Sequence, residues 1–554
     1  LSGNSVRYFI DGVPLDSKGS YVTLANLPVN LIDRVEIYKG VVPASLGTDA
    51  LGGAVNIITQ AEKKSFMDAS YSIGSFHTHR ANLNAQFMER HTGLVVRPAI
   101  GISYSKNDYR MKDVQMRNET GDQFIYGNPK RFHDGYFSLL AQIEAGITGK
   151  FWADEFFVSA SYSKTDKELQ TGSIQTKVYG MAEHNSDAWN VSVRYNKYNF
   201  MTESMTLKAT LSHTWDHSIT IDTAYRKYYW DGGYIVSQRN EIRGNEPSIR
   251  HYKRPLTIVR VNLDYQLDGH HGLNLNYHMN RTGNDRYDDL DQSFEPSNDA
   301  VTKHIIGLTY SQSFFDGKMQ NIFFAKDYVN HPNIRQTDQS TVTGSDKVQG
   351  STTKNYFGYG TGLRYMFFDP LAVKVSYEHS VRLPIARELL GNGTTIYANV
   401  ALKPEKSNNV NLALFGTWHP AGRHTIYYEA NGFLRYVDNY IQTSVIEKEG
   451  MMQFVNDPAV HIKGVEGEIR YDWDGRLQLM ANVSYQDARD QQKYKEDGKP
   501  SATYDNHVPN RPWLFGNAEA SYTFHNLLLH DNKLRLGCTF QWVCLLYTSD
   551  AADE

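Results

Sequence analysis

A strict alternation of apolar and polar side chains runs through this chain from about residue 66 to about residue 543. In residues 204–215, for example, Met205 and Leu207 alternate with Thr206 and Lys208, and the pattern is equally clear in residues 255–268 and 405–418. A period of two places successive side chains on opposite faces of a β-strand. The pattern therefore predicts an all-β fold, although an antiparallel sheet with one face in water could show the same alternation.

The connections between these segments alternate in length. Tight hairpin signals occur at Asp268-Gly269, Asp316-Gly317, Asp369-Pro370, Pro420-Ala421-Gly422 and Asp474-Gly475. Long polar connections lie between them, at roughly residues 108–134, 168–184, 218–254, 283–300, 331–351, 384–404 and 491–508. Short turns at one rim and long loops at the other are typical of bacterial outer-membrane barrels. The sequence therefore favours a transmembrane antiparallel β-barrel.

Aromatic residues stand just before four of the short turns. They are Phe314, Phe315, Phe367, Phe368, Trp418, Tyr471 and Trp473. An aromatic belt is expected where barrel strands leave the hydrocarbon core of a membrane. The short turns are thus predicted to mark one membrane interface.

Composition excludes several other classes of protein. Mean hydropathy is −0.53. The chain has no run of about 18 apolar residues, which a membrane-spanning helix would need. Barrel strands do not show up in this test because half of their side chains face the lumen. The net charge is −4 and the chain has no runs of Arg or Lys, so it lacks the basic patch expected of a protein that binds nucleic acid. The two cysteines, Cys538 and Cys544, form no disulfide framework and no Cys-x-x-Cys motif.

The first 60 residues have a different, glycine-punctuated pattern. Two strands are predicted within residues 32–59, the first with Val35 and Ile37 on a half-buried face, and a further strand and turn at residues 7–15. Glycines between the strands stand where turns need positive φ or close backbone approach. The residues that define the pattern are Asp11, Gly12, Arg34, Glu36, Gly40, Gly47, Gly52, Gly53 and Asn56.

This pattern closely resembles the C-terminal half of the plug domain of TonB-dependent outer-membrane receptors. That family has an Ile-Asp-Gly-Val-Pro strand and turn, then Ile-Glu-Arg-Ile-Glu-Val, a Tyr-Gly, and a Gly-Gly-x-Ile-Asn-Ile motif; here Leu46 replaces the tyrosine. Residues 380–389 and 400–408 resemble the paired Phe-Arg-Ala-Pro and Leu-Lys-Pro-Glu-x-Ser boxes that flank an extracellular loop, with Val381 and Leu383 as departures. The resemblance covers residues 1 to about 543.

The resemblance implies a plug domain over residues 1–60 and a β-barrel over residues 66–543. Residues 544–554 fit neither and resemble translated adapter sequence. About nineteen strands can be counted up to Trp542, whereas the family closes with twenty-two. The signal peptide, the TonB box, the first half of the plug and about three final strands are therefore expected outside this sequence. With two unpaired edges in hydrocarbon, the fragment alone is expected not to insert stably.

The richest candidate for ligand binding is a loop segment that contains Tyr225, Arg226, Tyr228, Tyr229 and Trp230. Aromatic faces with interleaved cations suit a flat anionic ligand, such as a ferric catecholate or hydroxamate chelate. The alternative is that these aromatics pack within a loop or at the membrane interface.

A second candidate is the histidine pair His77 and His79, predicted in a short outer loop. Two imidazoles could contact a metal or haem, but no third ligand stands near them in the sequence, so two solvated histidines are the alternative. Haem receptors of the family carry a histidine between the two loop boxes, and residues 383–402 contain none. No cofactor and no catalytic constellation are predicted.

The resemblance implies an active importer rather than an enzyme. Its outer loops and plug would capture a scarce ligand, most simply a ferric siderophore, and the TonB–ExbB–ExbD complex would couple proton motive force to its release into the periplasm. Alternatives within the family are an oligosaccharide importer with a surface lipoprotein partner, or a haem or cobalamin importer. A passive porin or an adhesin is the alternative from a different class, and neither needs a plug.

Overall fold

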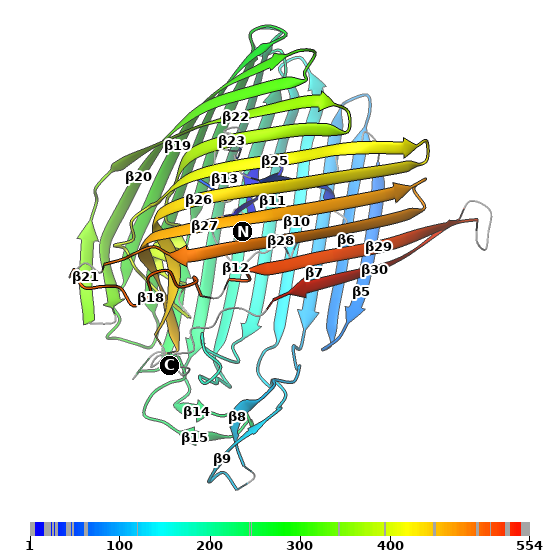
Figure 1. Ribbon diagram of the computed structural model, residues 1–554. Coiled ribbons are helices and arrows are strands. Elements are labelled where there is room, and N and C mark those ends of the chain that lie inside the picture. The colour runs from blue at the N-terminus through cyan, green and yellow to red at the C-terminus, as the bar shows by residue number, and fades with distance from the viewer. Residues whose placement is uncertain are drawn as a thin grey trace.

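The alternating segments form long antiparallel strands that close into a barrel around a small inner sheet, as the computed structural model shows (Figure 1). The structure describes residues 6–15, 24, 27, 32–39, 42, 46, 49–51, 53–59, 65–118, 120–242, 244, 246–341, 344–392, 395–446, 450–494, 498–509, 511–526 and 532–544. Both parts of the predicted fold class, the transmembrane-type barrel and the plug within its lumen, are confirmed.

The inner sheet has the strand order β2-β1-β4-β3. Its strands are β1 (Val6–Ile10), β2 (Val13–Pro14), β3 (Ile32–Lys39) and β4 (Gly53–Thr59). β1 runs parallel to β4, while β2 and β3 are antiparallel to their neighbours. Val35 and Ile37 are 49% and 64% exposed, so the half-buried face predicted for this strand is wrong. The reason is that β3 is an edge strand whose outer face borders a cavity.

The barrel begins with β5 (Phe66–Gly74) and ends with β30 (Lys533–Val543). Between them lie β6 (Thr78–Glu89), β7 (Leu94–Ser105), β10 (Tyr136–Lys150), β11 (Ala153–Glu168), β12 (Glu183–Lys197), β13 (Met205–Asp222), β16 (Ser248–Lys253), β17 (Leu256–Gln266), β18 (His271–Asp288), β19 (Ser297–Phe314), β20 (Met319–Thr341), β21 (Gly344–Gly350), β22 (Lys354–Phe368), β23 (Leu371–Arg382), β25 (Glu405–Ala421), β26 (His424–Ile446), β27 (Met451–Trp473), β28 (Leu477–Asp490) and β29 (Leu514–His525).

Two of these strands are interrupted. β16 and β17 both pair with β13 and β18, and they are separated at Arg254 and Pro255. A proline has no N–H for the sheet ladder, so a break is expected there. β21 and β22 both pair with β20. With each interrupted pair counted once, the described residues form nineteen barrel strands, as predicted.

The order of strands around the closed barrel places β30 beside β5. The two open edges expected from the sequence are therefore brought together in this structure. Side chains of both strands are exposed on both faces along almost their whole length.

The outer loops carry extra elements, which are β8 (Val114–Arg117), β9 (Phe124–Gly127), β14 (Arg226–Tyr228), β15 (Tyr234–Val236), α1 (Ala386–Leu390) and β24 (Ile396–Tyr397). Several predicted loops are shorter than expected because strands continue into them: β13 reaches Asp222 and β20 reaches Thr341. Neighbouring strands keep pairing past the point where the alternation of apolar and polar residues in the sequence ends. The predicted short turns are confirmed, for example by positive φ at Asp474 and Gly475.

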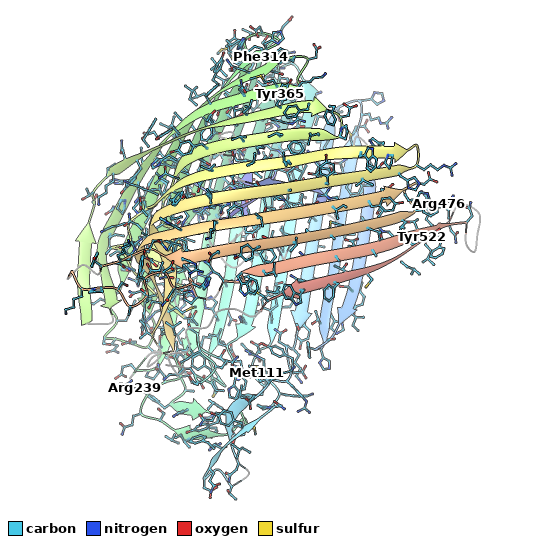
Figure 2. All side chains as sticks on the ribbon, in the orientation of Figure 1. Met111, Arg239, Phe314, Tyr365, Arg476 and Tyr522 are labelled. Atoms are coloured by element: carbon cyan, nitrogen blue, oxygen red, sulfur yellow. The ribbon has the colours of Figure 1, made fainter. Side chains whose placement is uncertain are left out.

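Outward side chains of the barrel are apolar and inward ones are polar. On β13, Leu211 and Trp215 are more than half exposed, whereas Ser212 and Thr214 are buried in the interior. Phe315, Phe367, Phe368 and Trp418 are exposed at the end with the short turns, which we call the turn rim. Figure 2 shows Phe314 and Tyr365 at this rim, far from Met111 and Arg239 at the opposite loop rim. No helix among the described residues is long and apolar enough to cross a membrane.

Candidate functional site

The predicted plug residues of β1, β3 and β4 meet at the turn between β1 and β2. Asp11 and Gly12 both have positive φ, at 49° and 76°, as a two-residue hairpin turn requires. The Gly12 N–H donates to Asn56 Oδ1 at 2.9 Å, and Asn56 Nδ2 donates to Glu36 at 3.4 Å. A side chain on Gly12 would also collide with Arg260, whose guanidinium donates to the Gly12 carbonyl. The motif therefore shapes a turn that points at the barrel wall.

The remaining motif residues lie around this turn or outside the described part of the chain. Arg34 is exposed and pairs with Glu36 at 2.8 Å and with Asp33 at 3.1 Å. Burial alone would raise the pKa of Glu36, but hydrogen bonds from Tyr38, Arg34 and Asn56 lower it overall. Gly53 opens β4 with φ 140°. Gly40, Gly47 and Gly52 lie outside the described residues.

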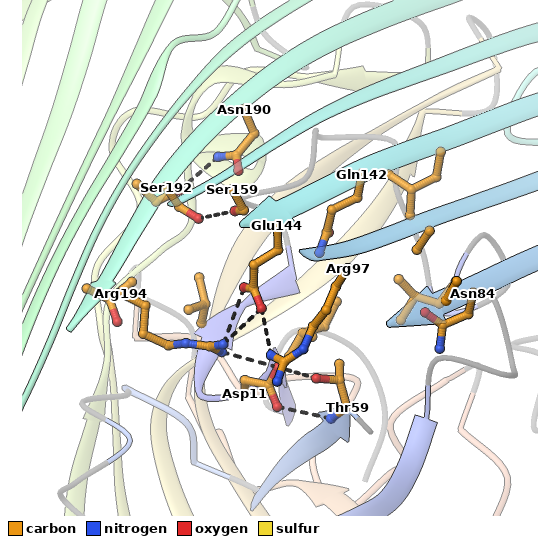
Figure 3. Close-up of a pocket in the computed structure, with 18 of the residues that line it drawn as sticks. Asp11, Thr59, Asn84, Arg97, Gln142, Glu144, Ser159, Asn190, Ser192 and Arg194 are labelled. Carbon is orange, nitrogen blue, oxygen red and sulfur yellow. Dashed lines mark hydrogen bonds and ion pairs between the residues drawn. The ribbon is translucent and has the colours of Figure 1, made fainter. Parts of the chain in front are cut away.

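Asp11 belongs to a cluster of four charges, which we call the charge gate: Asp11, Arg97, Glu144 and Arg194 (Figure 3). Glu144 accepts from Arg97 at 2.8 Å and from Arg194 at 3.1 Å, while Asp11 lies 3.6 Å from Arg194. Both guanidiniums also lie over the ring of Phe157, 4.7 and 5.1 Å from its centroid. The barrel thus supplies three members of the gate, and the plug supplies only Asp11.

Two cavities lie between plug and barrel on either side of the charge gate. One of about 70 Å³ is bordered by polar side chains of β10 to β13, among them Ser159, Asn190 and Ser212. A larger one of about 390 Å³ lies nearer the turn rim and is bordered by Glu155, Asn196 and Lys208, further along the same strands, and by Arg260. Asp11, Arg97 and Arg194 border both cavities.

A buried plug carboxylate, Asp49, holds the plug on another side. Arg7 of the plug lies 2.9 Å from it, Lys303 of β19 lies 3.7 Å away, and the Leu383 N–H donates to it at 3.1 Å. Burial alone would raise the pKa of Asp49, but Arg7, Lys303 and Arg382 outweigh it and bring the pKa to about 2. The carboxylate is therefore a fixed anion at neutral pH.

Beside Asp49, the two loop boxes recognised in the sequence meet in one buried ion cluster. Arg382 donates to Glu405 at 2.6 Å and to both oxygens of Glu388 at 3.0 Å, and all three side chains are almost completely buried. Glu388 also accepts the Ile385 N–H at the start of α1, and Glu405 accepts the Ile441 N–H. The cluster thus joins the β23–β25 loop to β26.

An apolar contact lies beside this ion cluster. Leu51 of the plug packs into a cluster of inward-facing residues of β26 to β28 and one residue of the β28–β29 loop: Phe433, Val437, Tyr440, Val460, Ile462, Ala488 and Val508. Nearer the turn rim, Lys39 lies 3.2 Å from Glu429, 3.9 Å from Glu466 and 4.0 Å from Glu468. A further cavity of about 390 Å³ borders Lys39 there. The plug is therefore bound to this side of the barrel by apolar packing and by charges.

The predicted aromatic loop segment is divided between a packed core and a more exposed face. Tyr228 and Trp230 are buried together with Met111, Val114 and Val178, so β8, the 169–182 loop and β14 form one compact lobe. Packing thus accounts for these two aromatics. Tyr229 is more exposed, with Arg117 4.4 Å from its ring centroid and Lys227 at 5.5 Å.

The other two residues of that segment lie at the edge of the lobe. Arg226 lies over the Tyr234 ring at 4.1 Å and donates to the Tyr228 hydroxyl at 3.1 Å. The Tyr225 carbonyl accepts from the Ser237 N–H, which closes the β14–β15 hairpin. Arg117 also pairs with Asp231 at 3.1 Å and thereby ties the β8–β9 hairpin to the β14–β15 hairpin.

Glu241 fastens the lobe to the barrel, a role that the sequence did not signal. Its Oε2 accepts the N–H groups of Gly180, Met181 and Ala182 at 2.9 to 3.1 Å. Burial raises the pKa of Glu241, although these backbone donors oppose the rise. Asp222 in turn accepts the N–H groups of Glu241 and Ile242.

His77 and His79 contact different partners. His77 lies in the β5–β6 turn, with Nδ1 3.7 Å from Asp108. His79 faces outward from β6, where it hydrogen-bonds the Tyr71 hydroxyl at 2.7 Å and stacks on Tyr104. In the described part of the chain, no group of three or more His, Cys, Asp or Glu side chains is arranged to hold a metal ion.

Comparisons with known proteins match both parts of the fold. Residues 1–54 match the family described as "TonB-dependent Receptor Plug Domain", and residues 176–550 match "TonB dependent receptor-like, beta-barrel". Among similar solved structures, the copper transporter OprC has a TM-score of 0.71 at 13% identity, over 97% of this chain and 82% of that one.

Two further solved structures are similar over nearly the whole chain. The FrpB iron transporter from Neisseria meningitidis (F3-3 variant) has a TM-score of 0.65 at 15% identity, over 95% of this chain and 77% of that one. The siderophore receptor PiuA from Acinetobacter baumannii has a TM-score of 0.66 at 13% identity, over 96% and 82%. At these identities the likeness concerns the fold alone.

Proposed function

The chain belongs to the TonB-dependent receptor family, and from that premise we propose that it imports an anionic metal chelate of the ferric siderophore type. Members of the family are outer-membrane transporters and not enzymes. The fold agrees with active import, because a barrel whose lumen holds a bound plug is not an open diffusion channel. A passive porin is therefore the weaker alternative.

The observation that carries the choice of ligand is the half-buried ring of Tyr229 in the lobe, with the cations that lie against it. Two cations, Arg117 and Lys227, lie over this one ring. A planar anionic chelate could stack on the ring edge to face, pair with Lys227 and take the place of Asp231 on Arg117. Each cation–aromatic contact contributes about 0.5–2 kcal/mol. Oligosaccharides and cobalamin carry no comparable array of negative charge, so this arrangement favours a chelate over them.

The similar solved structures include proteins named as a copper transporter, an iron transporter and a siderophore receptor. That range supports a metal or a metal chelate as the ligand class without selecting one ligand. Energy would come from the TonB–ExbB–ExbD complex acting on the plug. Ligand binding must then favour a plug state that TonB can engage, because a ligand shifts only an equilibrium whose states it binds differently.

Uptake of radioactive iron tests the proposal. Iron-starved cells that express the receptor receive ⁵⁵Fe as ferric citrate or as a ferric tris-catecholate, with and without functional TonB. We expect TonB-dependent uptake of at least one of these anionic chelates, and no competition by neutral maltodextrin or cobalamin. Uptake of neither chelate, or uptake that is independent of TonB, would contradict the proposal.

The outer lobe is tested with point variants in a binding assay. Tyr229→Ala and Arg117→Gln should each raise the Kd for the imported chelate about 5- to 30-fold, which corresponds to about 1–2 kcal/mol. Tyr126→Ala is the matched control, because Tyr126 is a 71% exposed tyrosine of the neighbouring β9 strand. Equal Kd values for Tyr229→Ala and Tyr126→Ala would remove the lobe from the binding site.

A further inference from the structure

We propose that the imported ligand passes the plug along one side of the barrel, through the charge gate, and that this side selects anions. We call the inward-facing residues of β7, β10 to β13 and β17 the passage wall. The inward-facing residues of β23 and β25 to β28, together with Lys303 of β19, are the anchor wall. The inference rests on the proposed function and adds to it the route and the charge of the ligand.

The first argument is the arrangement of the cavities along the passage wall. The two cavities follow the same strands: Ser159 and Ser192 border the smaller one, whereas Glu155 and Asn196, on the same two strands, border the larger one. Five of the described residues border both cavities: Asp11, Arg97 and Arg194 of the charge gate, and Thr59 and Thr210. On the anchor wall, the cavity beside Lys39 is followed toward the loop rim by the Leu51 cluster and the Arg382 ion cluster. Between the described plug and barrel residues, a continuous route thus needs less rearrangement on the passage wall.

The second argument is the chemistry of the passage wall above the gate. Its side chains are small and polar and bond one another: Ser159 to Ser192 at 2.6 Å, and Asn190 to Ser212 at 2.8 Å. Water or a polar ligand can replace such bonds at a net cost of only about 0.5–1.5 kcal/mol each. One apolar residue of this wall, Leu140, contacts the plug residues Leu15, Leu27 and Ile57.

Opening the anchor wall would cost far more. Leu51 belongs to a cluster with six residues of this wall and Val508 of the β28–β29 loop, and each apolar side chain exposed to water costs about 1.5–3 kcal/mol. Displacing Asp49 with the plug would in addition leave Lys303 without this carboxylate in a buried site and break the hydrogen bond from the Leu383 N–H. Several such terms exceed the cost of opening a wall of hydroxyl groups, so the plug should part from the passage wall first.

The third argument is the geometry of the charge gate. Asp11 is its weakest member, 3.6 Å from Arg194, whereas Glu144 lies 2.8 Å from Arg97 and 3.1 Å from Arg194. Arg194 Nε has no hydrogen-bond partner within the described part of the structure. When the plug withdraws Asp11, Glu144 can keep both arginines in place over Phe157. The gate can therefore open by moving the plug alone.

Withdrawal of the plug would leave a net positive route. The barrel side chains that border the two cavities include four cations, Arg97, Arg194, Lys208 and Arg260, and two carboxylates, Glu144 and Glu155. Around the cavity beside Lys39 the barrel contributes Lys374 and Arg470 against Glu429 and Glu468, with Glu466 close by. A narrow cleft lined by one sign of charge concentrates ions of the opposite sign. Anions are thus favoured on the passage wall only.

Cysteine labelling tests both the route and the charge without knowledge of the ligand. Ser192→Cys on the passage wall is paired with Ser376→Cys on the anchor wall, which borders the other cavity. Both are made in the full receptor with Cys538 and Cys544 replaced by serine. Cells are treated with a negatively charged or a positively charged methanethiosulfonate, while respiring or after addition of a protonophore.

We expect the labelling rate at Ser192→Cys to rise about fivefold or more in respiring cells, and the rate at Ser376→Cys to stay unchanged. The ratio of the labelling rate with the negative reagent to the rate with the positive reagent should be about three times larger at position 192 than at position 376. Arg194→Gln in the Ser192→Cys background should lower that preference. Ser159→Cys repeats the measurement if Ser192→Cys does not fold.

An unchanged rate at position 192, a rise only at position 376, or a preference for the positive reagent would each overturn the inference. The labelling result is separate from the uptake result. Chelate uptake without a change at position 192 would refute the route and leave the proposed function standing. Energy-dependent labelling at position 192 without uptake of either chelate would support the route and refute the proposed function.

Discussion

The passage wall and the anchor wall hold the same plug by different chemistry. The anchor wall binds it with an apolar cluster around Leu51, a buried carboxylate at Asp49 and a cation, Lys39, against three glutamates. The passage wall meets it with one apolar contact at Leu140, a hydrogen bond from Arg260 to the Gly12 carbonyl and one longer ion pair, Asp11 to Arg194, while its hydroxyl and amide groups border a cavity. The difference teaches that one plug can be both firmly retained and easily displaced, because the two properties reside on different sides of the barrel.

The largest difference between the walls should appear when a buried arginine is removed. Arg382→Ala leaves Glu388 and Glu405 buried without their shared cation, so the free energy of unfolding should fall by about 3–5 kcal/mol. Arg194→Ala on the passage wall is the matched control and should cost less than half as much, since Arg97 still pairs with Glu144. Denaturant titration of the purified receptor measures both, and equal losses would break the comparison.

The next largest effect is expected at the plug side of the same contact. Asp49→Asn removes the charge shared by Arg7 and Lys303, and should lower the free energy of plug release by about 2–4 kcal/mol. The measurement is the urea concentration at which a cysteine at Ala54, buried inside the plug, becomes reactive to a maleimide. An unchanged urea midpoint would show that Asp49 does not anchor the plug.

Acid should weaken the same contact by about 2 kcal/mol. The pKa of Asp49 is lowered to about 2 in the folded protein, below its unfolded value of about 3.9. Its contribution to stability is therefore complete above about pH 5 and is lost as the pH falls toward 2. The urea midpoint for plug release should drop between pH 5 and pH 2.5 by more in the wild type than in Asp49→Asn. Parallel curves for the two proteins would contradict this assignment.

The smallest effect is expected at Asp11. Asp11→Asn keeps an acceptor for the Thr59 N–H, which donates to Asp11 at 3.0 Å. It loses the 3.6 Å ion pair with Arg194, and the 2.7 Å hydrogen bond from the Thr59 hydroxyl must reverse, with the new amide as donor. Plug release should become easier by about 1 kcal/mol or less. A loss as large as that of Asp49→Asn would mean that the plug is held equally on both sides.

Much of the fold could be predicted from the sequence, because period-two alternation and turn residues are local signals. The nineteen strands, the short turns and the aromatic rim follow from them. The loop lengths did not, since β13 and β20 extend past the point where apolar alternation ends. The exposure of Val35 and Ile37 could not be foreseen either, because it depends on β3 being an edge strand beside a cavity.

The candidate site could be predicted only in part. The plug motif identified Asp11, Gly12 and Asn56, and the loop boxes contain Arg382 and Glu405, although only the structure shows that these two pair. The charge gate was missed because Arg97, Glu144 and Arg194 occupy ordinary inward positions on three separate strands. Nothing local distinguishes them from other polar residues of a barrel lumen, and the register of the strands alone brings them together.

Cross-linking the plug to each wall in turn tests the central claim most directly. Thr59→Cys with Ser192→Cys ties it to the passage wall, and Lys39→Cys with Ser376→Cys ties it to the anchor wall, in each case through a flexible bismaleimide. Uptake of the ⁵⁵Fe chelate is compared before and after cross-linking of each variant. The account predicts that the first cross-link abolishes uptake and the second leaves most of it intact. Loss of uptake with the second cross-link alone, or with both equally, would contradict it.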